Sequence, residues 1–261
     1  MATERIPEVV RALGVAQSLV KEKEQLSACD HDIYRNYWKA TEVAPSLRPH
    51  QVESIKWLLT LALRKYRGAY LTHGTGRGKT ATIIAFGLEY WLMTNSQKPI
   101  LILVPLSLLG QWRSEFQNRF NVATDQVYVH HGRENRVEAA VDLGQEWSNS
   151  RYFDGQHFVV ATYDDLTGEA KKYDEYQVKM RSAAVLNKGR GVLDSLPLPV
   201  TPLTPLLSAQ FAMVVMDEAQ TMKNFDGTVF EAAMRMKAKF KVMATATPLE
   251  NNYSKLNIGS A

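Results

Sequence analysis

Three glycines at alternating positions lead directly into a lysine and a threonine in the segment HGTGRGKT, which begins at His73. The template for a loop that surrounds a triphosphate is G-x-x-x-x-G-K-[ST], and Gly78-Lys79-Thr80 matches its end. His73 stands where the template has its first glycine. Glycines allow backbone N–H groups to turn toward phosphate oxygens without obstruction by side chains. The segment therefore predicts a phosphate-binding loop, and an ordinary glycine-rich turn is the alternative.

Most residues of this loop have an expected role. The Lys79 ammonium would lie between the β- and γ-phosphates, and the Thr80 hydroxyl would ligate Mg²⁺. The helix that follows would add a partial positive charge at its N-terminus. Arg77 would either add a phosphate contact or face solvent. The residues expected to bind the nucleotide in this loop are Gly74, Thr75, Gly76, Arg77, Gly78, Lys79 and Thr80.

An acidic pair closes an apolar run in the segment MVVMDEAQ. A phosphate loop of this kind needs an acid at the end of a second strand to hold Mg²⁺. We predict that Asp217 is this metal ligand and that Glu218 orients or deprotonates the attacking water. The alternative is a surface Asp-Glu pair that opens a helix. Together the two motifs predict ATP and Mg²⁺ as ligands, with Lys79, Asp217 and Glu218 as the catalytic residues.

The elements that must position these residues alternate along the chain from Arg48 onward. Predicted strands are GAYLT (68–72), PILILV (99–104), QVYVHH, HFVVATY, FAMVVMDE and FKVMATAT, and predicted helices span 79–95 and 107–120. Strands that alternate with helices indicate βαβ units. We therefore expect an α/β fold with a mostly parallel central sheet and helices on both faces.

Two segments depart from this alternation. Residues 1–45 mix charged and apolar residues at roughly helical spacing and predict an N-terminal helical extension. Residues 168–210 hold a charged helical part and then LPLPVTPLTP, whose prolines exclude a regular helix or a central strand. The strand pattern resumes directly afterwards, so we expect an insertion into a single α/β domain that spans 46–261.

Composition excludes several classes of protein. The net charge is +4, from 31 basic and 27 acidic residues, which permits a polyanionic partner without indicating one. The single cysteine, Cys29, excludes an internal disulfide framework. The histidines show no spacing typical of a zinc site. The N-terminus is not a secretory signal, and the longest apolar run, 99–110, is too short to span a bilayer. We expect a soluble intracellular protein with no membrane partner.

The motifs and their order resemble the first RecA-like lobe of the Swi/Snf-type helicase-like ATPases, the chromatin-remodelling branch of helicase superfamily two. The similarity runs from about Leu47 to Leu256. The segments that carry it are LRPHQVESIKWLL, GTGRGKT, LILVPLSLLGQWRSEF, HHGR, FVVATYDDL, VVMDEAQTMKN and ATATPLENN. The resemblance implies a RecA-like P-loop fold for residues 46–261.

The resemblance also implies roles for further residues. Gln51 would read the edge of adenine, and a side-chain amide can form the two hydrogen bonds that this requires. Candidate contacts to the phosphates of one strand of duplex DNA are Ser107, Gln111, Thr162 and Tyr163. Trp112, beside Gln111, is instead expected in the core. Thr245 and Thr247 would link the nucleotide site to the DNA track, and the alternative is that they simply end a strand.

The function implied is that of a nuclear, DNA-dependent and DNA-translocating ATPase of the chromatin-remodelling type, acting on double-stranded DNA or nucleosomes. The chain ends soon after the last motif. We therefore expect the partner lobe, a second RecA-like domain with arginine fingers, to be absent and the single lobe to hydrolyse ATP poorly. Two alternatives remain: a catalytically degenerate DNA- or protein-binding module, and an RNA helicase of the same superfamily. The contexts RPHQ and DEAQTMKN argue against the RNA helicase.

Overall fold

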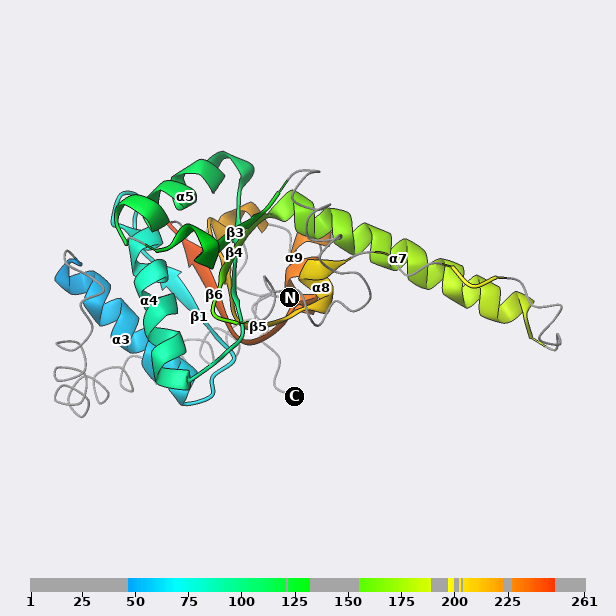
Figure 1. The fold of residues 1–261 in the computed structure, drawn as a ribbon, viewed down its shortest axis with the longest axis horizontal. Coiled ribbons are helices and arrows are strands. Elements are labelled where there is room, and N and C mark those ends of the chain that lie inside the picture. Colours follow the sequence, from blue (N-terminus) through cyan, green and yellow to red (C-terminus); the bar gives the residue numbers. More distant parts are fainter. Residues whose placement is uncertain are drawn as a thin grey trace, which may run out of the picture.

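A six-stranded sheet forms the centre of the computed structural model, which describes residues 47–120, 122–131, 155–188, 197–199, 202, 204–222 and 227–246. Its strands are β1 (Gly68–Thr72), β2 (Ile100–Val104), β3 (Val127–His130), β4 (Phe158–Thr162), β5 (Gln210–Met216) and β6 (Lys237–Thr245). Their order is β1-β6-β5-β2-β4-β3, and every neighbouring pair is parallel (Figure 1). The predicted α/β fold with a parallel sheet is confirmed.

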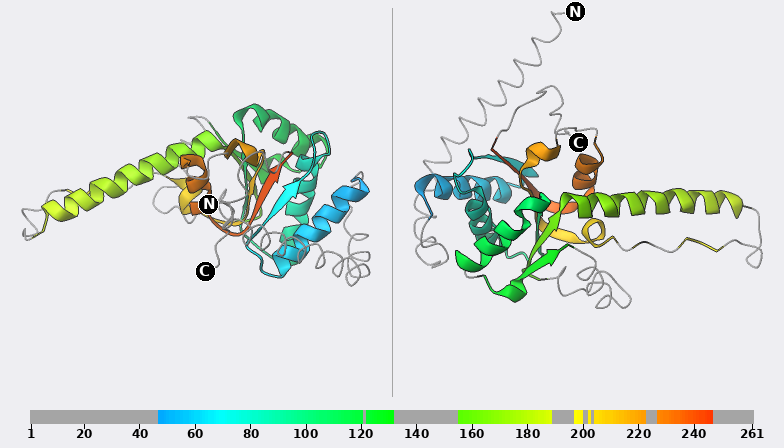
Figure 2. Two further views of the ribbon diagram at one scale, coloured as in Figure 1. Left: turned by 180° about the vertical axis from the view of Figure 1, so that it is seen from behind. Right: turned by 90° about the horizontal axis from the view of Figure 1, so that it is seen from above.

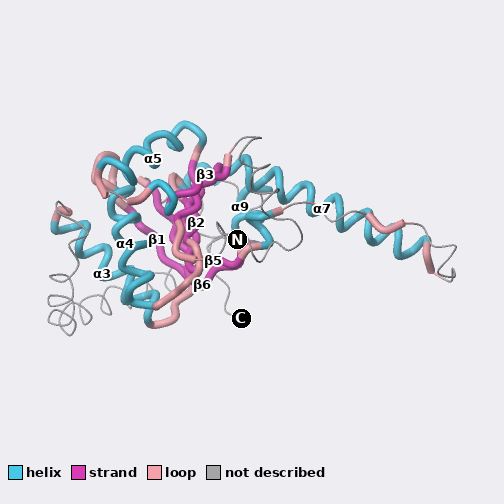
Figure 3. The backbone as a smooth tube through the Cα atoms, in the orientation of Figure 1, coloured by secondary structure: helices cyan, strands magenta, loops and turns pink. Residues whose placement is uncertain are grey.

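Helices cover both faces of this sheet, as predicted (Figure 2). One face packs against α3 (Pro49–Leu63), α4 (Lys79–Thr94) and α5 (Leu109–Asn118). The other packs against α7 (Tyr163–Leu186), α8 (Pro205–Ser208) and α9 (Thr228–Arg235). Short 3₁₀ turns, η1 (Leu106–Leu108), η2 (Thr124–Gln126) and η5 (Ala219–Met222), lie in the connections. Figure 3 shows the strands between the two groups of helices, with α3, α4 and α5 on one side and α7 and α9 on the other.

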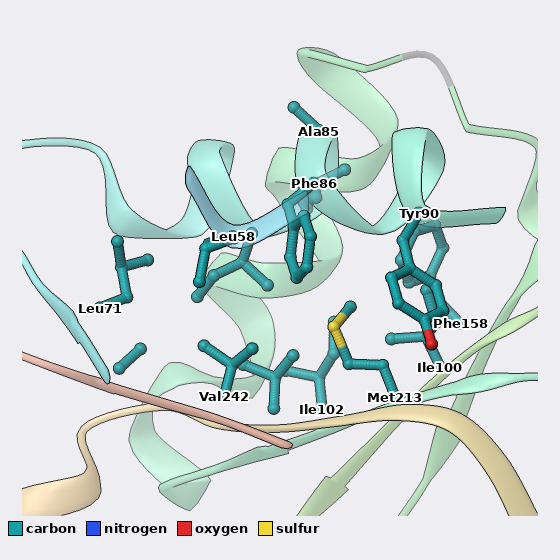
Figure 4. Packing of buried hydrophobic residues seen from close by; sticks show 14 of the residues in the cluster. Leu58, Leu71, Ala85, Phe86, Tyr90, Ile100, Ile102, Phe158, Met213 and Val242 are labelled. Atoms are coloured by element: carbon teal, nitrogen blue, oxygen red, sulfur yellow. The ribbon is translucent and has the colours of Figure 1, made fainter. Parts of the chain in front are cut away.

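The apolar runs of the sequence become strands that are buried on both sides. In β2, Ile100 and Ile102 belong to the core on the α4 face, whereas Leu101 and Leu103 belong to the core on the α7 face. This is the pattern expected of a parallel strand between two helical layers. Figure 4 shows the first of these cores, where side chains of α3 and α4 meet those of β2, β5 and β6.

The parallel strands bring their carboxyl ends to one edge of the sheet. Thr72 pairs with Thr245 in register, Leu103 with Met216, and Val104 with Thr162. The segments that follow β1, β6, β5, β2 and β4 therefore leave the sheet side by side. In open parallel α/β sheets, ligands bind outside this edge.

The helix α7 is 24 residues long and projects away from the body of the domain (Figure 1). It begins at Tyr163, directly after β4, and nearly all its buried residues lie in its first two turns. Pro205 is the first residue of α8, a position where the proline ring is tolerated in a helix. The predicted extension at 1–45 lies outside the described residues, and the boundaries of the insertion stay predictions. No helix within the described ranges combines the length and the apolar character that a membrane crossing needs.

Candidate functional site

The glycine-rich loop connects β1 to α4 at the carboxyl edge of the sheet. Gly76 and Gly78 have φ values of 72° and 79°, in the left-handed region that favours glycine. The N–H of Arg77 donates to the carbonyl oxygen of Gly74 at 3.2 Å and closes a turn. Gly74, Thr75, Gly76 and Arg77 are exposed. The loop therefore presents its backbone to solvent immediately before a helix N-terminus.

Gln51 holds this loop from the side of α3. Its Nε2 donates to the carbonyl oxygen of Gly78 at 2.9 Å, and its Oε1 accepts from the backbone N–H of Arg48 at 2.8 Å. The side chain is buried. A Cβ atom on Gly78 would lie 2.5 Å from the Gln51 Nε2. Gln51 thus fixes the loop, a role that the sequence did not suggest, and its contact with adenine stays a prediction.

Lys79 begins α4 and turns toward the acidic pair that follows β5. Its buried Nζ donates to the carbonyl oxygen of His73 at 3.3 Å and lies 3.6 Å from the Glu218 Oε1. Thr80, the second residue of the helix, is half-buried. An ammonium is unfavourable at the positive end of a helix, so the carboxylate of Glu218 offsets the charge that Lys79 brings there.

Asp217 follows the last residue of β5 and is held by several hydrogen bonds. Its backbone N–H donates to the Leu103 carbonyl oxygen at 2.9 Å. Its Oδ2 accepts from the Trp112 Nε1 at 2.9 Å, and its Oδ1 accepts from the Glu218 N–H at 2.9 Å. Burial raises the pKa of the Asp217 carboxyl above its ordinary value, and the hydrogen bond from Trp112 opposes this shift.

Glu218 has a φ of 48°, a left-handed conformation that is uncommon outside glycine. This conformation belongs to the tight turn between β5 and η5. The Gln220 Nε2 donates to the Glu218 Oε2, and the Gln220 Oε1 accepts from the Thr245 hydroxyl at the end of β6. A chain of polar contacts thus runs from Lys79 to Thr245. This places Thr245 where its predicted coupling role would need it, whereas Thr247 lies outside the described residues.

The four predicted DNA contacts have two different environments. Ser107 and Gln111 are exposed, in η1 and α5 beyond the end of β2. Thr162 is buried, and its hydroxyl caps α7 by accepting from the Asp165 N–H and donating to the Asp165 Oδ2. Tyr163 is also buried, and its hydroxyl donates to the Asp217 carbonyl oxygen at 2.7 Å. The structure thus brings two of the four to the surface of the edge and uses the other two inside the protein.

His73 is a further residue whose place the sequence did not indicate. Its Nε2 lies 2.8 Å from the Ser54 hydroxyl, and its ring packs edge-on against His50 with centroids 5.5 Å apart. Burial lowers the pKa of His73, and the nearby His50, Lys79 and Arg77 add to this shift. The residue that replaces the template glycine therefore secures the start of the loop to α3.

Comparisons with known proteins agree with this geometry. A family model described as the SNF2-related domain matches residues 50–257. The ATP-dependent helicase FUN30 of Saccharomyces cerevisiae is 29% identical over 211 residues, which cover 81% of this chain and 15% of FUN30. An uncharacterised ATP-dependent helicase of Schizosaccharomyces pombe is 26% identical over 208 residues, which cover 79% of this chain and 18% of that protein.

A solved structure has the same fold. The SWI2/SNF2 ATPase core of Sulfolobus solfataricus in complex with double-stranded DNA superposes with a TM-score of 0.55 at 22% identity, over 80% of this chain and 34% of that one. The chain spans less than a fifth of each of the two helicases. The family model includes the loop at Gly78, the acidic pair after β5 and the end of β6. The chain therefore belongs to the SNF2-related domain family.

Proposed function

We propose that this chain is the ATP-binding lobe of a DNA-dependent, DNA-translocating ATPase of the chromatin-remodelling type. The observation that carries the proposal is the meeting of Lys79 and Glu218, 3.6 Å apart, from the loops after β1 and β5. An ammonium, a buried carboxylate and a backbone loop at a helix N-terminus are the groups that bind and activate a nucleoside triphosphate. Membership in a family that includes ATP-dependent helicases supports the same assignment.

The residues present fit a magnesium ion that arrives with the nucleotide. Each oxygen of Asp217 accepts one hydrogen bond and keeps a further lone pair, and the Thr80 hydroxyl lies at the start of α4. Mg²⁺ commonly uses one or two protein oxygens together with phosphates and water. No cluster of three or more His, Cys, Asp or Glu side chains that could hold a metal ion occurs among the described residues. Asp217 and Thr80 would hold the ion, which would neutralise charge on the β- and γ-phosphate oxygens.

The chain's own groups would act on the phosphates and on the attacking water. Lys79 would leave Glu218 and bind the phosphates, and Glu218 would then orient the attacking water and accept its proton. Gln220 would keep Glu218 in place, because it contacts both Glu218 and Thr245. Efficient turnover would require arginine fingers from a second RecA-like lobe, worth about 10³ to 10⁵ in rate. The single lobe would thus bind ATP and hydrolyse it poorly.

Double-stranded DNA is the proposed polymer partner, alone or in a nucleosome. The solved core with the same fold was in complex with double-stranded DNA. The exposed Ser107 and Gln111, with Arg113 beside them, would contact phosphates of one strand, a kind of contact that positions the protein without reading sequence. A nuclear location would follow from a role in chromatin. The test for an RNA helicase is ATP hydrolysis by a protein that joins this lobe to a second RecA-like lobe. If RNA stimulates this hydrolysis and duplex DNA does not, the chain belongs to an RNA helicase instead.

The proposal is tested by binding of Mg²⁺-ATP to the chain and to two variants, Lys79→Ala and Asp217→Asn. We expect Lys79→Ala to weaken binding at least about tenfold. Asp217→Asn should remove most of the difference between the ATP affinity measured with Mg²⁺ and the ATP affinity measured with a chelator. Equal binding by all three proteins, or none by any, would mean that the loop does not bind a nucleotide and would favour a degenerate binding module.

A further inference from the structure

Asp217, the proposed metal ligand, accepts a hydrogen bond from each face of the sheet. On the α4 face, the Nε1 of Trp112 donates to the Asp217 Oδ2 at 2.9 Å. On the α7 face, the Tyr163 hydroxyl donates to the Asp217 carbonyl oxygen at 2.7 Å. One contact orients the carboxylate, and the other fixes the backbone from which it extends.

Both donors are buried groups that use their proton on Asp217. An indole N–H can only donate, and Trp112 is buried, so it needs an acceptor inside the protein. The buried Tyr163 hydroxyl has a single proton, which it donates to the Asp217 carbonyl oxygen. Phenylalanine at either place would remove the hydrogen bond and keep an aromatic ring.

The two donors also belong to the segments that leave the sheet beside Asp217. Trp112 lies in α5 directly after the exposed Gln111, and Tyr163 is the first residue of α7, directly after Thr162. These segments follow β2 and β4, and β2 lies between β5 and β4 in the sheet. One hydrogen bond thus links Asp217 to α5, and another links it to the start of α7.

We infer that Trp112 and Tyr163 are positioning residues that place Asp217 for Mg²⁺ and make its position depend on the two segments that flank the DNA-binding edge. The inference rests on the proposed function, because it takes Asp217 as the metal ligand and α5 as part of the DNA contact. DNA bound at Ser107 and Gln111 sets the position of α5, and Trp112 transmits that position to the carboxylate. Metal affinity and DNA affinity are then coupled, and the coupling acts equally in both directions.

The test is the ratio of ATP affinities measured with Mg²⁺ and with a chelator, for the chain and its variants. Trp112→Phe removes the N–H and keeps an aromatic ring, and we expect the ratio to fall about three- to tenfold. Trp91→Phe is the matched control, because the buried Trp91 donates its Nε1 to the Lys98 carbonyl oxygen, remote from the acidic pair. Loss of stability alone would lower ATP affinity with and without Mg²⁺ alike and leave the ratio unchanged.

A second pair of variants covers the case in which Trp112→Phe does not fold. Tyr163→Phe removes only a hydroxyl, and we expect about a threefold fall in the same ratio. Its control is Tyr90→Phe, which removes the hydroxyl that donates to the Ala212 carbonyl oxygen at 3.3 Å. For the coupling, short duplex DNA should change the affinity of the wild-type chain for Mg²⁺-ATP, and Trp112→Phe should bring this change close to zero.

The outcomes separate the two proposals. If the wild-type chain shows no Mg²⁺-dependent binding of ATP, the proposed function fails and the inference falls with it. If the wild-type chain shows that dependence and Asp217→Asn abolishes it, the proposed function stands. Folded Trp112→Phe and Tyr163→Phe proteins that then keep the wild-type ratio within about twofold would overturn the inference alone.

Discussion

The side-chain amide of Gln51 donates to the carbonyl oxygen of Gly78 at 2.9 Å and so joins α3 to the residue that precedes Lys79. The same nitrogen lies 2.5 Å from where a Cβ of residue 78 would be. Gly78 also has a φ of 79°. Two independent constraints, a close approach and a left-handed backbone, therefore require glycine at the position where the loop becomes a helix.

Gly78→Ala should disturb the loop on both grounds. The left-handed conformation alone costs a residue with a side chain about 1 to 2 kcal/mol, and the Gln51 amide must move as well. We expect a lower melting temperature and at least about tenfold weaker ATP binding. Gln51→Ala in the same protein should relieve the contact and leave the backbone cost.

Gly168→Ala is the control for this substitution. Gly168 lies inside α7 with nothing within 4 Å of a Cβ atom. Alanine there should stabilise the helix by about 0.5 to 1 kcal/mol and leave ATP binding unchanged. If Gly78→Ala behaved like Gly168→Ala in thermal unfolding and in ATP titration, the loop would tolerate a side chain at this position.

Glu218→Gln should separate nucleotide binding from hydrolysis. Glu218 is the proposed base, and it also holds the Nζ of Lys79 at 3.6 Å. The neutral amide cannot accept the proton of water, so ATP hydrolysis by a protein that joins this lobe to a second RecA-like lobe should fall by at least about 100-fold. The affinity for ATP should stay unchanged or rise by up to about fivefold. The triphosphate no longer has to displace Glu218 from Lys79, an ion pair worth up to about 1 kcal/mol.

The comparison needs both measurements on the same variant. A single-turnover assay gives the hydrolysis rate, and titration of the chain gives ATP affinity. Glu115→Gln is the control, since Glu115 pairs with Arg119 on α5 and takes no part in the acidic pair. Hydrolysis that survives in Glu218→Gln would remove Glu218 from the catalytic residues.

Much of the fold follows from patterns that are local in the sequence. The apolar runs at β2 and β5 predict buried strands, since a strand covered by helices on both faces is apolar throughout. The alternation of such runs with helical patterns predicts the parallel sheet. The glycine-rich loop and the acidic pair can also be recognised in the sequence, each directly after a predicted strand. Parallel strands bring their carboxyl ends to one edge of the sheet. This is why Lys79 and Glu218 meet across that edge.

The contacts within the site were less predictable. Trp112 shows its burial by its helical spacing, but nothing local in the sequence shows that its N–H points at Asp217 rather than at a backbone carbonyl. Tyr163 comes directly after the end of β4, and residues after strand ends, such as Ser107, are often exposed at this edge. Only the packing of α7 turns the Tyr163 side chain inward. Gln51 reaches the loop because α3 lies against α4, a packing that sequence spacing alone does not set.

His73 should make the stability of the domain depend on pH. Its pKa in the folded protein lies below the usual value of 6.5, because of burial and then the neighbouring His50, Lys79 and Arg77. The unfolded chain therefore binds a proton that the folded protein does not bind between these two pKa values. The free energy of unfolding is therefore not reduced by His73 above pH 6.5. It decreases as the pH falls from 6.5 through the lower pKa of the folded protein.

Thermal unfolding from about pH 8 to about pH 5.5 measures this effect. His73→Gln cannot titrate, so its melting temperature should fall less than that of the wild type over this range. His157→Gln, at the turn near Gly155, controls for the loss of a histidine elsewhere. Identical pH profiles for His73→Gln and the wild type would remove His73 as the source of the dependence.

Thr245→Val should weaken the link between the acidic pair and β6 without affecting the binding of nucleotide. The Thr245 hydroxyl donates to the Gln220 Oε1, and Gln220 in turn donates to Glu218. Valine keeps the shape of the side chain and leaves Gln220 without that donor, so Glu218 should lose part of its orientation. In a protein that joins this lobe to a second RecA-like lobe, we expect the stimulation of ATP hydrolysis by duplex DNA to fall about three- to tenfold, with ATP affinity within about twofold of the wild type. Thr94→Val, which removes the hydroxyl that donates to the Tyr90 carbonyl oxygen at the end of α4, should leave both quantities unchanged. Equal stimulation in Thr245→Val and Thr94→Val would mean that β6 does not take part in the coupling.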